Sequence, residues 1–336
     1  MKKILKTLTI FIMLLVTISL FRVQASSKQY VYLGGDSIGL KMNTGVYVVG
    51  KYEVQTKRGR VSPWQNSNIN VGDTIEKING IKVDTNKQLI NYLNQSNQDI
   101  ANLQIKRGNT SFNTNIEIIK NSTNEKSIGL YIRDQILGIG TLTFITENNQ
   151  FASLGHGVYD NQVLLSVASG DLYKSSVRNI KKSEPGIAGE KRASLERGII
   201  GTIYENDVTG LYGKLENISK NNKLVEVASQ KDVKNGPAKI YTVVDGQTIN
   251  EYNIEIIDIK RQSRKGVKGI KFKVTDSNLI AKTGGIVQGM SGSPIVQDGK
   301  IIGAVSHVTV ENPIYGYAMH IAYGLERIGY IQCIDR

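Results

Sequence analysis

The chain has 336 residues, a length that favours two domains, and its 40% hydrophobic and 21% charged residues are typical of globular protein. Its single cysteine, Cys333, excludes an internal disulfide and a zinc site made of several cysteines. Basic residues exceed acidic residues by 42 − 29 = 13, which favours anionic partners such as nucleic acid, membrane lipid or wall polymer.

The N-terminus has the pattern of a targeting segment. Lysines in the first six residues precede an uncharged, mostly apolar run, Thr7–Phe21, and Val23-Gln24-Ala25 resembles a small-x-small cleavage site. The run is shorter than the roughly 20 residues that a membrane-spanning helix needs. We interpret residues 1–25 as a signal peptide or an uncleaved membrane anchor. Both alternatives predict export, which argues against a nucleic-acid partner.

Residues 26–36 are interpreted as a linker, and residues 37–120 as one folded unit. Alternating residues predict two short strands near its start, Ile38–Met42 and Gly45–Val54, and two more at Leu103–Arg107 and Asn113–Ile119. Between them lie an Asn79-Gly80 hairpin turn and a helix that Asp84 or Thr85 can cap. The unit is therefore predicted to be a small β-rich domain with one helix.

This unit resembles a bacterial PDZ domain in Ser37-Ile38-Gly39-Leu40 and in the segment Val71–Val83 that precedes the helix. The resemblance implies a loop at Ile38, Gly39 and Leu40 whose amides bind a peptide carboxylate. It also implies a strand edge that accepts a peptide C-terminus or an internal segment, with Leu89 on the opposite wall of the groove. The alternative is a small β-rich domain without a ligand.

A second domain is predicted over residues 127–336, where strand follows strand. Its sharpest motif is Gly-x-Ser-Gly-x-Pro around Ser291, which places a serine in a tight turn before a buried strand. Such a turn can aim the amides of Gly289 and Ser291 at one oxyanion. The segment resembles the nucleophile loop of chymotrypsin-like peptidases, with Ser293 where a glycine is usual. The alternative is a purely structural turn.

A serine nucleophile needs a base, and the chain offers three histidines. His156 follows the strand Gly140–Thr146, a turn and a second strand, which is how a chymotrypsin-like barrel presents its base. We therefore predict His156 as the base. His307 and His320 are interpreted as core or surface residues.

The acid is less well determined by the residues alone. Asp276 stands 291 − 276 = 15 positions before Ser291, whereas the acid of chymotrypsin-like enzymes usually lies nearer to the histidine. Three other aspartates, Asp160, Asp171 and Asp207, are rivals on that ground. Spacing alone leaves the choice open.

Several motifs together resemble the stage IV sporulation protein B family. They are Leu-Gly-His-Gly at His156, Val-Thr-Asp at Asp276, and the segments Gly284–Ile295 and Gly299–Val308. The resemblance implies that His156, Asp276 and Ser291 form a catalytic triad. It also implies a mainly β chain, with a PDZ domain (a small β-barrel with a helix) before a chymotrypsin-like double β-barrel. No cofactor and no metal is expected.

The resemblance further implies a serine endopeptidase of sporulation. Such enzymes are made in the forespore and exported to the space between the two membranes. There they cleave a membrane-bound regulator, which triggers activation of a late sigma factor, and they process themselves. Two alternatives are a non-catalytic exported PDZ adaptor and a general envelope-quality protease. Whether the N-terminal segment is cleaved or keeps the protein at the membrane stays open.

Overall fold

The computed structural model describes residues 28–108, 110–160, 163–167, 169–217, 222–262 and 264–331. The predicted signal or anchor segment and Cys333 lie outside these residues. The described chain is mainly β, with short helices at α2 (Asn86–Gln95), α3 (Ser277–Thr283) and α4 (Ile321–Arg327). No helix in this part of the chain is long and apolar enough to cross a membrane.

Six antiparallel strands close into a first barrel, each pairing with the next and the last with the first. In spatial order they are β2 (Ser37–Lys51), β11 (Leu130–Ile145), β12 (Gln150–Ser153), β17 (Gly210–Leu215), β16 (Glu190–Asp207) and β15 (Ser169–Lys181). Inward-pointing apolar residues such as Leu40, Phe151 and Leu211 fill its core. Because each of the six strands pairs with two others, none of them forms a free edge of the sheet.

A second barrel closes in the same way. Its strands, in spatial order, are β19 (Gly236–Val243), β20 (Ile249–Ile259), β21 (Ile270–Val274), β24 (Tyr315–His320), β23 (Lys300–Val308) and β22 (Pro294–Gln297). In β21 the apolar residues point inward and the lysines point outward, as strict alternation requires. The two barrels form the double β-barrel expected from the sequence.

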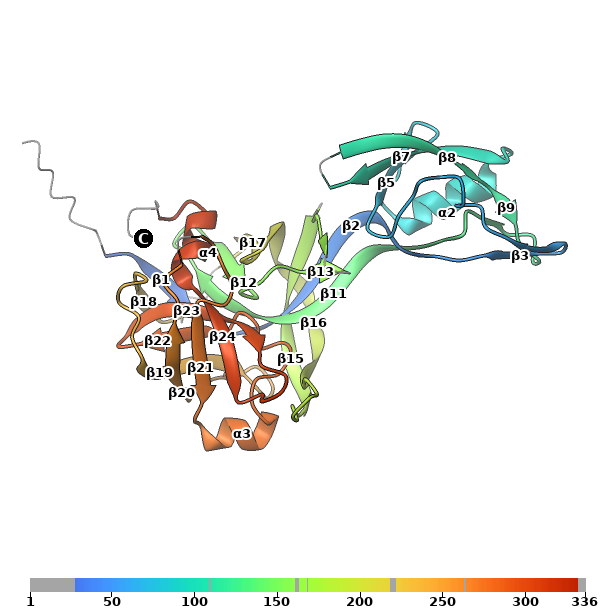
Figure 1. Cartoon of the computed structure of the whole chain (residues 1–336). Helices are drawn as coiled ribbons and strands as arrows, with labels where there is room; N and C mark the ends of the chain where they lie inside the picture. Colours follow the sequence, from blue (N-terminus) through green and yellow to red (C-terminus); the bar gives the residue numbers. More distant parts are fainter. Residues whose placement is uncertain are drawn as a thin grey trace, which may run out of the picture.

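The barrels are joined by strands from the start and the middle of the chain (Figure 1). β1 (Tyr30–Leu33) pairs with β11 of the first barrel and with β18 (Leu224–Val227), which in turn pairs with β23 of the second barrel. Val31 is fully buried in an apolar cluster that also takes residues from both barrels and from α4. The prediction of a linker over residues 26–36 is therefore wrong for this strand, which belongs to the core shared by the two barrels.

The unit that resembles a PDZ domain in sequence, called the PDZ unit below and defined as residues 44–134, contains α2 and the far ends of β2 and β11. Its other strands are β3 (Val54–Thr56), β4 (Gly59–Val61), β5 (Thr74–Ile78), β6 (Ile81–Lys82), β7 (Ile100–Arg107), β8 (Thr110–Glu117), β9 (Ile119–Lys120) and β10 (Lys126–Ser127). Of the two residues predicted as caps, Asp84 and Thr85, it is Thr85 that caps α2. Thr85 also forms a capping box with Gln88. Asn79 and Gly80 both have positive φ, as the predicted hairpin turn requires.

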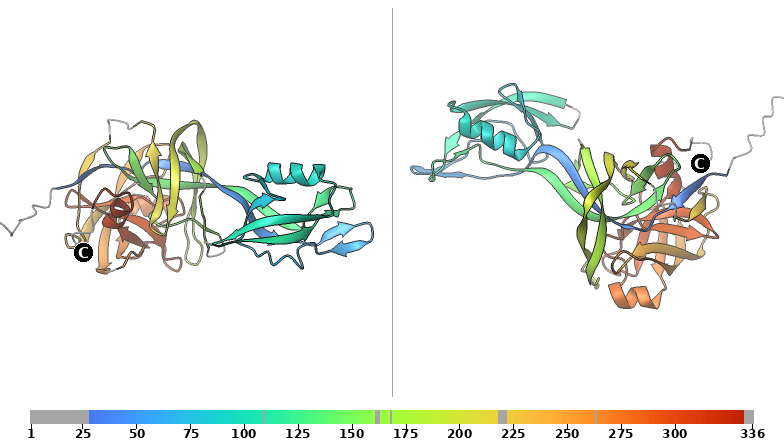
Figure 2. Two further views of the ribbon diagram at one scale, coloured as in Figure 1. Left: turned by 90° about the horizontal axis from the view of Figure 1, so that it is seen from above. Right: turned by 180° about the vertical axis from the view of Figure 1, so that it is seen from behind.

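β2 and β11 form a continuous ribbon that leaves the first barrel and enters the PDZ unit (Figures 1 and 2). Asn43 pairs with Gln135 near the point where the ribbon leaves the barrel. Beyond it, Val46 and Val48 are buried in the core of the PDZ unit. The predicted boundaries of 37–120 therefore need correction, because one strand on each side of the PDZ unit is shared with the barrel.

The predicted PDZ groove residues lie elsewhere than expected. Ile38, Gly39 and Leu40 stand at the start of β2, paired with β11 on one side and β15 on the other in the first barrel. The prediction of a carboxylate-binding loop at these residues is wrong, because the first barrel needs this strand to close. Leu89 is fully buried in the core of the PDZ unit, so it does not line an open groove.

The shared ribbon generates a prediction about which part of the chain folds alone. Replacement of residues 44–134 by Asn-Gly should leave a folded double barrel, because Asn43 and Gln135 are already paired and Asn-Gly suits a two-residue hairpin. Removal of residues 37–120 should instead unfold the chain, because it takes a strand out of the first barrel. Circular dichroism and thermal melting of the two variants check this. A cooperative melt of the second variant would contradict the assignment of β2.

Candidate active site

The predicted nucleophile lies in a turn between α3 and β22, the nucleophile loop (residues 284–293). Ser291 is half-buried at the turn, whereas Ser293 is fully buried and its Oγ has no hydrogen-bond partner among the described residues. A buried hydroxyl cannot reach a substrate carbonyl. Of the two serines in the motif, Ser291 is therefore the one that a substrate can approach.

Two threonines of the first barrel hold the carbonyl groups of this loop. The Thr141 amide donates to the Ser291 carbonyl at 3.0 Å, and its Oγ1 donates to the Gly289 carbonyl at 2.7 Å. Two positions further along β11, Thr143 Oγ1 donates to the Gly292 carbonyl at 2.8 Å. The two hydroxyls lie on one face of β11, because alternate residues of a strand share a face, and together with the Thr141 amide they fix three loop carbonyls.

The loop amides divide into used and free donors. Met290 donates to the Val287 carbonyl at 3.1 Å, and Gly292 donates to the Val305 carbonyl at 2.8 Å. In the part of the chain that the structure describes, the amides of Gly289 and Ser291 donate to no protein group. These are the two amides predicted to form an oxyanion hole, and the amide of a buried residue such as Gly289 rarely lacks a partner.

His156 lies just beyond the end of β12, close to the strand that holds the nucleophile loop. The Leu154 amide donates to the Thr141 carbonyl at 3.3 Å, and His156 follows Leu154 by two residues. The imidazole Nδ1 lies 2.7 Å from the Gly157 carbonyl. A carbonyl can only accept, so Nδ1 carries the proton and Nε2 keeps its lone pair, as a general base requires.

Burial and a second histidine shape the electrostatics of this base. Burial lowers the pKa of His156 below its usual 6.5, so the ring is neutral at pH 7. The His307 ring, on β23, lies with its centroid 5.4 Å from that of His156. Burial and the neighbouring His156 lower the pKa of His307 to about 4. The sequence interpretation treated His307 as a core or surface residue and missed its place beside the base.

Among the described residues, the predicted acid, Asp276, makes no hydrogen bond to the predicted base. Asp276 is the N-cap of α3, where its carboxylate accepts from the amides of Asn278 and Leu279 at 3.0 and 3.1 Å. Its second oxygen accepts from the Asn253 amide at 3.2 Å. None of these bonds involves His156, whose Nδ1 is occupied by the Gly157 carbonyl.

The rival aspartates do not fill that place either. Asp207 accepts from the amide and hydroxyl of Thr209, and Asp171 accepts from the Tyr173 hydroxyl at 3.3 Å. Asp160 lies in the short strand β13 (Tyr159–Asp160), which pairs with β14 (Val163–Leu164). Among the described residues, no carboxylate is hydrogen-bonded to the imidazole.

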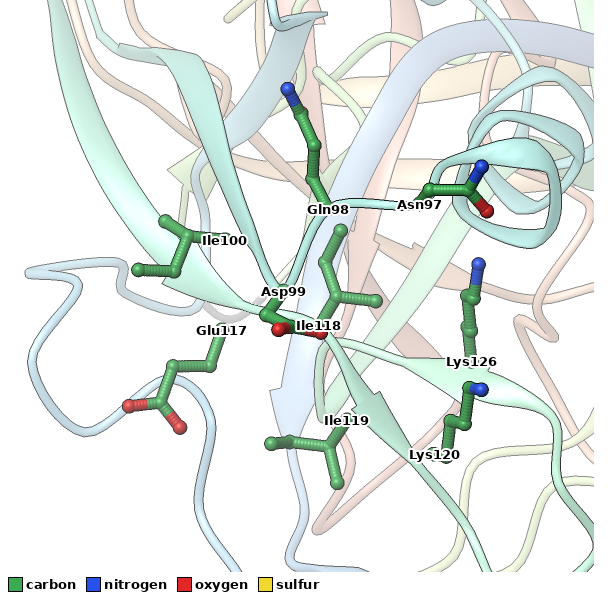
Figure 3. A pocket seen from close by; sticks show the side chains of 9 residues that line it. All are labelled: Asn97, Gln98, Asp99, Ile100, Glu117, Ile118, Ile119, Lys120 and Lys126. Carbon is green, nitrogen blue, oxygen red and sulfur yellow. The ribbon is translucent and has the colours of Figure 1, made fainter.

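Two hollows elsewhere hold no serine–histidine pair. One, of about 550 Å³ in the PDZ unit, is lined by Asn97–Ile100, Glu117–Lys120 and Lys126, so it brings carboxylates and lysines together without a nucleophile (Figure 3). The other lies at one end of the first barrel beside Asp36 and Lys174. No cluster of three metal-ligating side chains occurs in the described chain. The candidate active site is therefore the nucleophile loop with His156.

Comparisons with solved structures and with protein families give similarities to two kinds of domain. The chain resembles, at the level of solved structures, the active form of the Rv3671c protease from M. tuberculosis (13% identity, 59% of this chain and 76% of that chain, TM-score 0.34). It also resembles a PDZ domain of an SdrC-like protein from Listeria monocytogenes (21% identity, 26% and 87% covered, TM-score 0.22). No curated protein matches. The model of the SpoIVB peptidase S55 family matches residues 124–325, more than half of the chain, which therefore belongs to this family of serine peptidases.

Proposed function

We propose that this serine peptidase is exported and cleaves a membrane-bound regulator in the space between forespore and mother cell, which triggers late sigma factor activation, and that it processes itself. The observation that carries the catalytic part is the pair of free amides, Gly289 and Ser291, beside an accessible serine. Family membership and the lysine-led apolar run at the N-terminus support the sporulation role and export.

In the proposed mechanism, Ser291 Oγ attacks the scissile carbonyl while His156 Nε2 takes its proton. The negative charge that develops on the carbonyl oxygen is stabilised by the amides of Gly289 and Ser291. These amides need no rearrangement, because Thr141 already holds the carbonyls of the same two residues. The imidazolium then gives its proton to the leaving amine. The Gly157 carbonyl holds Nδ1–H throughout, and so keeps the ring in the tautomer that the reaction needs.

We propose that the PDZ unit holds a segment of the protein substrate. The β2–β11 ribbon connects it to the barrel without a flexible linker, so a bound segment is kept at a fixed distance from Ser291. Such tethering raises the local concentration of the scissile bond without any new contact at the active site. The variant in which Asn-Gly replaces residues 44–134 separates this contribution from catalysis, because it keeps the nucleophile loop intact.

Substitution of each serine in the motif tests the nucleophile. Ser291→Ala should abolish labelling by a fluorophosphonate probe and should lower self-cleavage more than about 1,000-fold, because a serine peptidase without its nucleophile retains little activity. Ser293→Ala is the matched control. It should keep labelling and should be as stable as the parent or more so, because it removes a buried hydroxyl that has no partner. If Ser293→Ala loses labelling and self-cleavage while Ser291→Ala keeps both, Ser293 is the nucleophile and Ser291 is not.

Two substitutions at Asp276 distinguish a helix cap from a triad acid. Asp276→Asn should keep most activity, because asparagine caps a helix as well as aspartate does. Asp276→Ala should lower the free energy of unfolding by about 1 kcal/mol through loss of the cap. Self-cleavage rates and thermal melts measure both effects. A large loss of activity in Asp276→Asn with an unchanged melt would instead support the triad that the family resemblance implies.

The neutral base gives a pH dependence with a definite sign. A general base acts only when deprotonated, so the labelling rate of Ser291 should rise with pH as His156 loses its proton. Because burial lowers the pKa of His156, the midpoint of the rise in labelling rate should lie below pH 6.5. The labelling rate should reach its maximum by neutral pH. Probe labelling across about pH 4 to 8 measures it. A midpoint above 7 would indicate a carboxylate beside the imidazole, since a nearby anion raises its pKa.

A further inference from the structure

Lys191, near the start of β16, is a buried lysine that has no acidic partner among the described residues. The residue is 5% exposed, and burial alone lowers the pKa of its amine to about 7. Its Nζ donates to Thr242 Oγ1 at 2.9 Å and to Thr141 Oγ1 at 3.4 Å. A lysine buried without a carboxylate is costly, so its presence here calls for a function.

The main chain of Lys191 contacts the nucleophile loop directly. Its amide donates to the Gln288 carbonyl at 2.9 Å, and the Gln288 amide donates to the Gly189 carbonyl at 2.8 Å. The Gln288 carbonyl and the Gly289 amide belong to one planar trans peptide, in which they point in opposite directions. The bond from Lys191 therefore turns the Gly289 amide away from β16, and this is one of the two free amides of the proposed oxyanion hole.

The side chain of Lys191 acts on the next peptide through Thr141. Because the amine donates to Thr141 Oγ1, the hydroxyl proton of Thr141 is directed to the Gly289 carbonyl, 2.7 Å away. The aliphatic part of Lys191 also packs against Gly289. A Cβ added to Gly289 would lie 3.1–3.3 Å from the Cβ, Cγ and Cδ atoms of Lys191. Gly289 is thus held on both sides, and its φ of +90° favours glycine at this position.

We propose that Lys191 is a positioning residue that keeps the Gly289 amide directed at the developing oxyanion. It acts through its own amide on the peptide before Gly289, and through its amine and Thr141 on the peptide after it. The proposal rests on the peptidase function proposed above. It adds a residue from the first barrel, far from Ser291 in sequence, to the machinery that stabilises negative charge.

The test uses Lys191→Met in the full chain, with the fluorophosphonate probe as the reagent. Methionine keeps the apolar volume and the backbone amide but removes the amine. The phosphonyl oxygen of the probe occupies the oxyanion hole, so the inactivation rate constant should fall at least about 10-fold, less than the 100-fold or more that loss of a donor itself causes. The concentration of probe for half-maximal rate should change little, and the melting temperature should not fall. Lys182→Met, at an exposed lysine of the same β15–β16 hairpin, is the matched control and should label like the parent.

Substitutions at Thr141 give a second measurement that does not depend on Lys191→Met folding. Thr141→Val should slow labelling, and Thr141→Ser, which keeps the hydroxyl, should restore it. In the double variant the two losses should not add, because both remove one chain of hydrogen bonds. Unchanged labelling in Lys191→Met, or additive losses with Thr141→Val, would overturn the proposal. If the parent chain does not label at all, the proposed peptidase function fails instead.

Discussion

The hydrogen bonds from β11 to the nucleophile loop are the interaction on which the active site depends. A tight turn of glycines has many conformations of similar energy, and only some of them present two amides to one oxygen. Thr141 and Thr143 take up the carbonyls of Gly289, Ser291 and Gly292. With these acceptors fixed, the amides of Gly289 and Ser291 are left without partners in the described structure, ready for a substrate.

This arrangement couples the two barrels. The nucleophile loop precedes a strand of the second barrel, whereas the threonines belong to the first, which also carries His156. The Thr141 carbonyl accepts from the Leu154 amide, so a single residue of β11 contacts both the loop of the nucleophile and the strand that leads to the base. Any movement of one barrel relative to the other would therefore change the oxyanion hole and the position of the imidazole together.

The sequence predicted the parts of the fold that depend on local pattern. Alternation predicted strands, the Asn79-Gly80 dipeptide predicted the hairpin turn, and Asp84 or Thr85 predicted the cap of α2. The Gly-x-Ser-Gly motif predicted the turn at Ser291. It could not predict that β2 runs on into the barrel, because that depends on pairing with β15, more than 100 residues away in the chain. Thr141 and Lys191 left a weaker signal. They are polar residues at buried positions of strands, which a pattern of solvated and apolar faces does not explain.

The assignment of the acid shows why a motif and a geometry have to be judged separately. The Val-Thr-Asp motif at Asp276 precedes a helix, and an aspartate in that position satisfies amides that would otherwise lack acceptors. That role explains the residue type through structure alone. The orientation of His156, in turn, needs only an acceptor for Nδ1–H, and a backbone carbonyl meets that need without bringing a charge into a buried site. The consequence is a base whose pKa is lowered by burial rather than raised by an anion, which suits a reaction that begins with a neutral imidazole at neutral pH.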